Sequence, residues 1–429
     1  MKHFSYFALL TLSLTAASCH SWFYSDSELF CEMNPGDDRC PDGGSVACAT
    51  NQDCTSGSTP VCDVAGTMTC VECLPDQADA CQGATPSCGS DHQCVGCTSH
   101  LDCAATSNVC RPDGSCANEQ DVAYVKMGGS GSACTQAVPC ATLGEGLAAK
   151  NVVKVLSGLV KGTNLTTIDG KQVAIFADAG AKLDRDGDGP ILEVRGNADV
   201  TISDLEITGQ SGIGDSAISV LPSGGTPKLT LARVMVVANQ GLGISSSGGT
   251  LTVSRSTISG NTGGGMSITN NTQFDLSNNI IAGNGGASTG FGGVRFDQTS
   301  SGTRVFEFNT VSNNVAADGT ATGVVCSLVT QAVTFSNNII YDNASSGTRT
   351  QVGGTNCSWT YSDIGPGLVP GNANVDMDPM FVNAGQNNFH LQATSPVKDA
   401  ADPNATLGMD IDGEPRPQGT ADIGADEIP

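Results

Sequence analysis

The chain has 429 residues, of which 43 are acidic and 19 are basic, and its formal net charge is −24. A charge of this sign repels phosphate backbones and anionic lipid surfaces, which argues against nucleic acid as a partner. The composition changes sharply near residue 120, from a part dense in Cys to a part dense in Gly, Ser, Thr and Asn. The length and this change predict more than one structural unit.

Residues 1–18 have the pattern of a secretory signal peptide. A basic start and an apolar run too short to span a bilayer are followed by small residues and Cys19. The ending TAASC resembles the bacterial lipobox, and the resemblance implies that Cys19 is lipidated and becomes the mature N-terminus. The acyl chains would make the membrane a partner, and His20 in place of Asp implies sorting to the outer membrane. The alternative is a plain signal peptide that is cleaved near this position. We interpret residues 19–47 as the lipidated N-terminus and a linker.

The cysteines fall in even groups, as expected for disulfides in an oxidising compartment. Residues 48–117 hold three sets of four with the same layout, joined through CVEC and CVGC. Paired CxxC motifs can also hold zinc, but export and the lack of a periodic apolar core favour two disulfides per set. Four cysteines allow three pairings, so the connectivity stays open. The sets resemble Cys-rich repeats of bacterial surface lipoproteins, which implies a stalk.

Residues 121–151 predict a cap at the start of a second unit. A short strand at AYVKM is followed by a loop flanked by Cys134 and Cys140, which we expect to be bridged. A helix then begins at Thr142, with Glu145 completing a capping box. The stretch resembles the entry of bacterial right-handed β-helix proteins, where a strand and a helix cover an apolar end that would otherwise aggregate.

An internal repeat predicts the fold of residues 152–367. A six-residue pattern (apolar, any, any, apolar or small polar, any, β-branched) recurs in steps of 22 to 30 residues, about one coil of a β-solenoid. A second strand family, such as PILEV, SAISV and GGMSI, lies between the copies. Leucine-rich solenoids are the rival fold, but no helix-length period separates these strands. The copies begin at Ile202, Leu231, Val253, Leu276, Phe306, Phe335 and Trp359.

Two columns of small polar residues should stack from coil to coil. Asn tolerates left-handed backbone angles at a tight corner, and its amide can hydrogen-bond the equivalent residue above and below. We therefore interpret these side chains as structural rather than as ligands. One column is Ser256, Asn279, Asn309, Asn338 and Ser362, and the other is Asn261, Asn284, Asn314 and Asn343.

Residues 368–429 form a C-terminal tail or cap. Its DMDPMFVNAGQNNFHLQATSPVKDAAD and DIDGEPRPQGTADIGADE segments resemble the C-terminal part of bacterial β-helix surface proteins of the pectin-lyase-like class, a resemblance that spans residues 121–427. It implies an all-β, right-handed parallel β-helix preceded by a small disulfide-rich region. Many proteins of that class are polysaccharide lyases, hydrolases or epimerases, but GHG, RIK and DPHE-like motifs are missing here. His390, the only His after the Cys-rich part, lies in the tail, so we expect no imidazole chemistry on the coils.

Two groups of charged residues are candidate sites. DRDGDG places Asp184, Asp186 and Asp188 in alternation before a Gly, like the start of an EF-hand-like Ca²⁺ loop, but Arg195 stands where the closing Glu would be. An acidic turn between strands is the alternative.

The second group is an outward column of Asp204, Arg233 and Arg255 on successive coils. Guanidinium forks suit an acidic sugar carboxylate or the charge neutralisation of a lyase. The alternative is an ion-pair ladder that keeps neighbouring coils in register.

Two functional hypotheses follow. The first is a binding or structural module, in which a surface-anchored β-helix on a disulfide stalk presents long faces to glycans or other surface partners. The second is an enzyme, a polysaccharide lyase or glycoside hydrolase that acts on acidic polysaccharide through Asp204, Arg233, Arg255 and a nearby acid. A groove floored by these residues with bound Ca²⁺ would favour the enzyme, and a flat face of Ser, Thr and Asn would favour the binding module.

Cys326 and Cys357 stand alone in the second unit. Strand alternation turns both side chains inward, and they are separated by about one coil. We expect a disulfide with a Cα separation of about 4.4 to 6.8 Å. Two buried free thiols are the alternative.

Overall fold

The computed structural model describes residues 48–298, 302–317, 320–328, 332–345, 350–417 and 420–429. The expectations for the signal peptide and for Cys19 lie outside these residues. The chain divides into two compact units after Ala117.

In the first unit, the three sets of four cysteines fold alike. The first Cys of each set bridges the third, and the second bridges the fourth, so each bridge closes a loop with a sequence separation of 13 to 16. A loop of this length contributes about 3 kcal/mol in the chain-entropy model. All twelve thiols are oxidised, which rules out the zinc alternative for these residues. The bridges are Cys48–Cys62, Cys54–Cys70, Cys73–Cys88, Cys81–Cys94, Cys97–Cys110 and Cys103–Cys116.

Regular structure in this unit is short. Each set pairs its third and fourth cysteines across an antiparallel turn, as β1 with β2, β3 with β4, and the isolated bridge between Cys110 and Cys116. The elements are η1 (Asn51–Asp53), β1 (Val61–Cys62), β2 (Cys70–Val71), η2 (Ala78–Ala80), β3 (Ser87–Cys88), β4 (Cys94–Val95) and η3 (His100–Cys103).

The second unit begins with the predicted cap. After η4 (Glu119–Asp121) and β5 (Val122–Val125), the bridge between Cys134 and Cys140 closes the loop before α2 (Leu143–Ala149). The Thr142 hydroxyl accepts from the Glu145 amide at 3.3 Å, and the Glu145 carboxylate accepts from the Thr142 amide at 3.0 Å. Leu143 and Leu147 of α2 are buried in the solenoid core. The helix therefore covers the first coil, as the sequence predicts.

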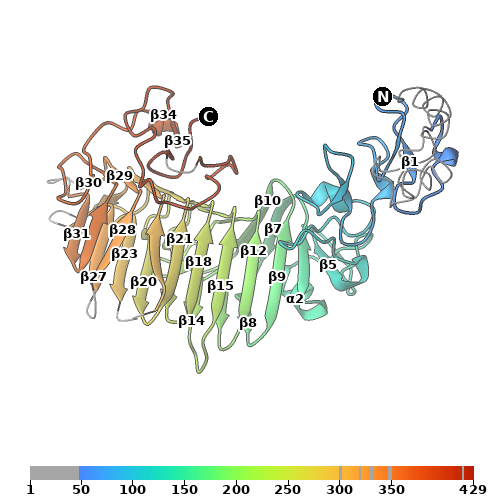
Figure 1. Ribbon diagram of the computed structural model, residues 1–429. Coiled ribbons are helices and arrows are strands. Elements are labelled where there is room, and N and C mark those ends of the chain that lie inside the picture. The colour runs from blue at the N-terminus through green and yellow to red at the C-terminus, as the bar shows by residue number, and fades with distance from the viewer. Residues whose placement is uncertain (1–47, 299–301, 318–319, 329–331, 346–349, 418–419) are drawn as a thin grey trace, which may run out of the picture. The chain divides into compact units, whose positions relative to one another are not determined.

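Three parallel sheets wind around the core as a β-helix (Figure 1). The ten-stranded sheet contains β5, β6 (Val152–Val155), β9 (Gln172–Ala177), β12 (Asp199–Ser203), β15 (Lys228–Ala232), β18 (Thr250–Ser254), β21 (Gln273–Ser277), β24 (Arg304–Glu307), β28 (Val333–Ser336) and β32 (Cys357–Thr360). The nine-stranded sheet contains β7 (Gly158–Gly162), β10 (Ala181–Arg185), β13 (Glu206–Thr208), β16 (Met235–Val237), β19 (Thr257–Ser259), β22 (Ile280–Ala282), β25 (Thr310–Ser312), β29 (Ile339–Tyr341) and β33 (Asp363–Gly365). The eight-stranded sheet contains β8 (Thr166–Asp169), β11 (Leu192–Arg195), β14 (Ser216–Leu221), β17 (Leu242–Ser247), β20 (Gly264–Asn270), β23 (Val294–Gln298), β27 (Val324–Leu328) and β31 (Val352–Thr355).

The six-residue pattern marks the corner between the ten-stranded and nine-stranded sheets. Its third residue has a positive φ in every copy, whereas its fourth points inward. The expectation that the stacked Asn residues themselves take left-handed angles is wrong by one position, because the left-handed residue turns the chain and the next one enters the core. The left-handed residues are Asp204, Arg233, Arg255, Asn278, Phe308, Asn337 and Tyr361, with φ from 48° to 65°.

Both predicted columns stack inside the coils. In the second column, the Asn261 amide donates to the Asn284 carbonyl at 2.9 Å, and the Asn284 amide donates to the Asn314 carbonyl at 3.0 Å. Asn239 extends this column at one end and Gln351 at the other. Each amide thus satisfies its neighbour and a backbone carbonyl where water has no access.

Aromatic side chains stack in the core of the later coils. The ring centroids of Phe274 and Phe296 are 4.7 Å apart, and those of Phe335 and Trp359 are 5.4 Å apart. Beside this stack, Cys326 bridges Cys357 with a Cα separation of 6.1 Å, within the expected range. The disulfide joins adjacent strand rows near the end of the solenoid.

The tail both caps the last coil and turns back along the coils. Val375 bridges Asp363 of β33 and closes the nine-stranded sheet. The following chain carries β34 (Phe381–Asn383), η5 (Ala384–Gln386) and β35 (Asn388–Leu391), and it folds back beside the solenoid (Figure 1). Its apolar side chains pack on outward residues of the nine-stranded sheet, with Phe389 on Ile280 and Ala282. A short pair, β26 (Val315–Ala316) with β30 (Ala344–Ser345), lies in the turns after β25 and β29.

Candidate functional site

The predicted charged column lies on successive left-handed corners. Arg233 Nε and Nη2 donate to the two carboxylate oxygens of Asp204 at 2.6 and 2.8 Å. This bidentate pair raises the pKa of Arg233, chiefly through its hydrogen bond to Asp204. The guanidinium fork that would bind a substrate carboxylate is therefore already engaged, which matches the register-ladder alternative.

Arg255 does not join this ion pair. The tail covers its corner, and Arg255 Nε donates to the Ile411 carbonyl at 3.4 Å. Burial and the neighbouring Arg233 lower the pKa of Arg255, while Asp410 and Asp412 oppose the shift. The third member of the predicted column thus belongs to the contact between the coils and the tail.

Asp184, Asp186 and Asp188 do not converge as a Ca²⁺ loop would require. Asp184 lies in β10, and Lys161 on the neighbouring strand places its ammonium 3.5 Å from Asp184 and 2.6 Å from Asp186. Among the described residues, these three carboxylates are not among the groups close enough to share one ion. The geometry therefore matches the acidic-turn alternative, in which Lys161 pairs with Asp184 and Asp186.

A hollow of about 520 Å³ lies at the corner between the eight-stranded and ten-stranded sheets. Three successive turns line it, after β14, β17 and β20. Its lining carries hydroxyl, amide and backbone groups and no charged side chain: Pro222, Gly225, Thr226, Ser247, Gly248, Gly249, Thr250, Asn270, Asn271 and Gln273.

Glycine in the middle turn keeps this hollow open. Gly248 and Gly249 have φ of +116° and +83°, which favour glycine, and a Cβ on Gly249 would lie 2.3 Å from the Pro227 carbonyl oxygen. The turns on either side bring larger side chains, so they form walls around a floor of backbone. Asn270 donates to the Ser247 hydroxyl at 2.6 Å and ties one wall to the floor. The volume of the hollow, about 520 Å³, falls within the range of small-ligand sites.

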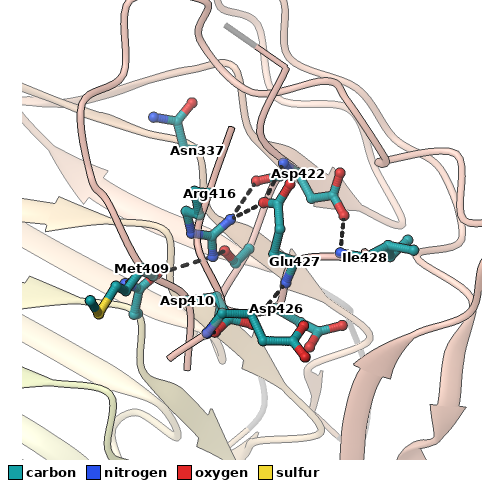
Figure 2. A network of polar contacts seen from close by, with 12 residues as sticks. Asn337, Met409, Asp410, Arg416, Asp422, Asp426, Glu427 and Ile428 are labelled. Atoms are coloured by element: carbon teal, nitrogen blue, oxygen red, sulfur yellow. Dashed lines mark hydrogen bonds and ion pairs between the residues drawn. The ribbon is translucent and has the colours of Figure 1, made fainter. Parts of the chain in front are cut away.

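A buried arginine holds the tail on the coils (Figure 2). Arg416 Nη1 donates to Glu427 at 2.8 Å, and Nη2 donates to the corner residue Asn278 at 3.0 Å. The guanidinium also lies 4.5 Å from the centroid of the Phe308 ring, on the next corner. Burial lowers the pKa of Arg416, opposed chiefly by Glu427 and Asp410. These contacts join residues far apart in the sequence and fix where the tail lies.

This placement brings His390 next to the coils. Phe389 is buried on β22, and the His390 imidazole emerges beside it, with Nε2 2.7 Å from Asp412 and 3.9 Å from Asp426. Burial is the main cause that raises the pKa of Asp426 to about 6. The tail therefore brings an imidazole close to the coils, which the position of His390 in the sequence does not indicate.

The three residues of this cluster lie in conspicuous tail segments, but no motif joins them. His390 lies in NNFHLQ, Asp412 in DIDGEP and Asp426 in DIGADE, all within the tail segments that carry the family resemblance. Those segments predict architecture, but the spacing of the three residues, 22 and 14 positions apart, does not indicate that they meet.

These features define an all-β protein with a right-handed parallel β-helix domain. Residues 190–362 match the family model described as the right handed beta helix region. No curated protein matches the chain. Among solved structures, the crystal structure of pectate lyase Pel9A is similar over 72% of this chain and 96% of that chain, with 15% identity and a TM-score of 0.38.

Proposed function

We propose that this chain is an exported, surface-anchored binding module that presents its β-helix to neutral glycans. The observation that carries the proposal is the uncharged hollow of hydroxyl, amide and backbone groups across three coils. Parallel coils repeat every ~4.8 Å, so the three turns offer a regular row of donors and acceptors to a chain of hydroxylated units. In a protein with a net charge of −24, a neutral hollow suits a neutral ligand.

The outer faces of the strands support a binding rather than a catalytic role. Thr201, Thr230 and Thr252 pair in register on the ten-stranded sheet, while Ser219, Ser245 and Ser267 pair in register on the eight-stranded sheet. In contrast, the candidate residues of the lyase hypothesis already have partners: Arg233 pairs with Asp204, and Arg255 donates to the tail.

The anchor is part of the proposal. No helix among the described residues is long and apolar enough to cross a membrane. Lipidation of Cys19 would attach the stalk to the outer membrane and leave the β-helix accessible. Replacement of Cys19 by Ser should move the protein from the membrane fraction to the soluble fraction or block its processing. A wild-type protein found wholly in the soluble fraction would contradict the anchor.

The hollow is tested by a matched pair of arginine variants. Thr226→Arg places a long side chain in the hollow, and Thr208→Arg adds the same charge to the outer face of β13. Full-length proteins should be compared for binding to neutral oligosaccharides and to polyuronates. We expect the wild type and Thr208→Arg to bind neutral glycans, and Thr226→Arg to lose at least tenfold in affinity. Equal binding by both variants, or unsaturated products released from polyuronate, would refute the proposal.

A further inference from the structure

A second, separate group of polar residues lies on the tail, outside the neutral hollow. His390 Nε2, Asp412 and Asp426 each offer one ligand atom, and these atoms lie within 4.8 Å of one another. Imidazole nitrogen with carboxylate oxygen is a common donor set for divalent transition metals. Elsewhere among the described residues, the comparable groups consist of cysteines that are already joined in disulfides.

Asp426 directs one of its two carboxylate oxygens toward this group. Its side chain is 10% exposed, and its Oδ2 accepts from the Leu391 amide at 2.7 Å. Its Oδ1 faces His390 Nε2 at 3.9 Å, too far for a hydrogen bond. This oxygen lies beside the imidazole nitrogen as a second possible ligand atom for a cation.

The imidazole is oriented so that Nε2 faces the two carboxylates. His390 Nδ1 lies 2.6 Å from the side-chain carbonyl of Asn388, an acceptor, so Nδ1 carries the proton in the neutral ring. The Nε2 lone pair then points at Asp412 at 2.7 Å. Two acceptors at this distance need a proton or a metal ion between them. Such an orienting partner on the far ring nitrogen is typical of metal-bound histidine.

The spacing of the donor atoms fits a metal ion. Bonds of about 2.0 to 2.2 Å place neighbouring ligand atoms of an octahedral or tetrahedral ion about 2.8 to 3.6 Å apart. The Nε2 distances of 2.7 Å to Asp412 and 3.9 Å to Asp426 lie on either side of that spacing. His390 and Asp412 are 43% and 53% exposed, so solvent or a further ligand has access to the remaining positions.

We propose that His390, Asp412 and Asp426 form a binding site for a divalent transition-metal ion such as Zn²⁺ or Mn²⁺. The imidazole donor disfavours Ca²⁺, which takes oxygen ligands. The buried Arg416–Glu427 pair fixes the neighbouring Asp426, and Asp410 accepts from the backbone amides of the turn that carries Asp412. The ligands thus come from three separate segments of the tail, and the ion would join them.

The test is direct metal binding by the full-length protein after chelator treatment without reductant, so that the disulfides stay closed. Titration calorimetry with Zn²⁺ and the absorption spectrum with Co²⁺ should be recorded for wild type, Asp412→Asn, Asp426→Asn and His390→Ala. Glu414→Gln is the matched control, because Glu414 is an exposed acid on the same turn outside the cluster.

We expect one Zn²⁺ site per chain in the wild type and in Glu414→Gln, with at least tenfold weaker binding in each cluster variant. Zn²⁺ should also raise the Tm of the wild type and not that of Asp412→Asn, which separates loss of the site from loss of the fold. Equal binding by wild type and Asp412→Asn, or no binding by a folded wild type, would overturn the proposal and leave an imidazolium ion pair.

Discussion

Replacing Asn284 by Ala tests the stacked column at its centre. The Asn284 amide donates to the Ile258 carbonyl at 2.8 Å and to Asn314 at 3.0 Å, and its carbonyl accepts from the backbone and side-chain amides of Asn261 at 3.1 and 2.9 Å. The substitution removes all four bonds in a fully buried position.

The cost follows from the groups that lose their partner. The Asn261 backbone amide and the Ile258 carbonyl each lose the bond to the Asn284 side chain, at about 1 to 3 kcal/mol per buried group. The small cavity adds to this, so we expect a loss of about 4 kcal/mol in the free energy of unfolding. Asn314 keeps its bond from the Asn284 backbone amide at 2.9 Å and should contribute little.

Guanidinium unfolding of the full-length protein, followed by far-UV circular dichroism, measures this loss. Asn404→Ala is the matched control, since Asn404 is exposed and its amide contacts the nearby Asp402. We expect that control to lie within about 0.5 kcal/mol of wild type. A loss below about 1 kcal/mol for Asn284→Ala would show that the column does not stabilise the coils.

Three further predictions concern the end of the solenoid and the tail. Replacing Cys326 and Cys357 together by Ala opens a loop with a sequence separation of 31 and should cost about 4 kcal/mol in chemical unfolding; an unchanged midpoint would refute it. Burial raises the pKa of Asp363 from 3.8 to about 7, so the unfolded chain releases this proton first, and stability should fall as pH rises from about 4 to about 7. Asp363→Asn should remove up to about 4 kcal/mol of that fall, and a parallel pH profile would contradict this. Arg416→Lys should weaken the buried contacts between the tail and the coils by about 3 kcal/mol and should speed protease cleavage of the tail. A cleavage rate equal to that of wild type would show that Arg416 does not hold the tail on the coils.

The repeating part of the fold could be predicted from the sequence because each coil meets the same environment. An apolar residue such as Leu231 or Leu276 recurs where a strand faces the core, and Asn recurs where an amide must stack. The start of the cap helix at Thr142 could also be predicted, because its capping box involves only residues close in sequence. The position of the left-handed corner was misplaced by one residue, because the pattern marks a turn without showing which of its residues takes a positive φ.

The candidate sites depended on contacts between distant parts of the chain. Asp204 and Arg233 were visible as a column, but only the structure shows that they hold each other. The neutral hollow arises because the longer turn after β14 lies beside the shorter turns after β17 and β20, which the coil repeat does not encode.

The sequence by itself determined the repeat, the cap, the even grouping of the cysteines and the inward direction of Cys326 and Cys357, since these depend on local patterns along the chain. The tertiary structure alone decided which cysteines pair within a set and where the tail lies. Arg416 reaches Asn278 across 138 positions, and that contact carries His390 to the coils. No periodicity spans such a distance, so only the packing of the tail brings His390 near Asp412 and Asp426.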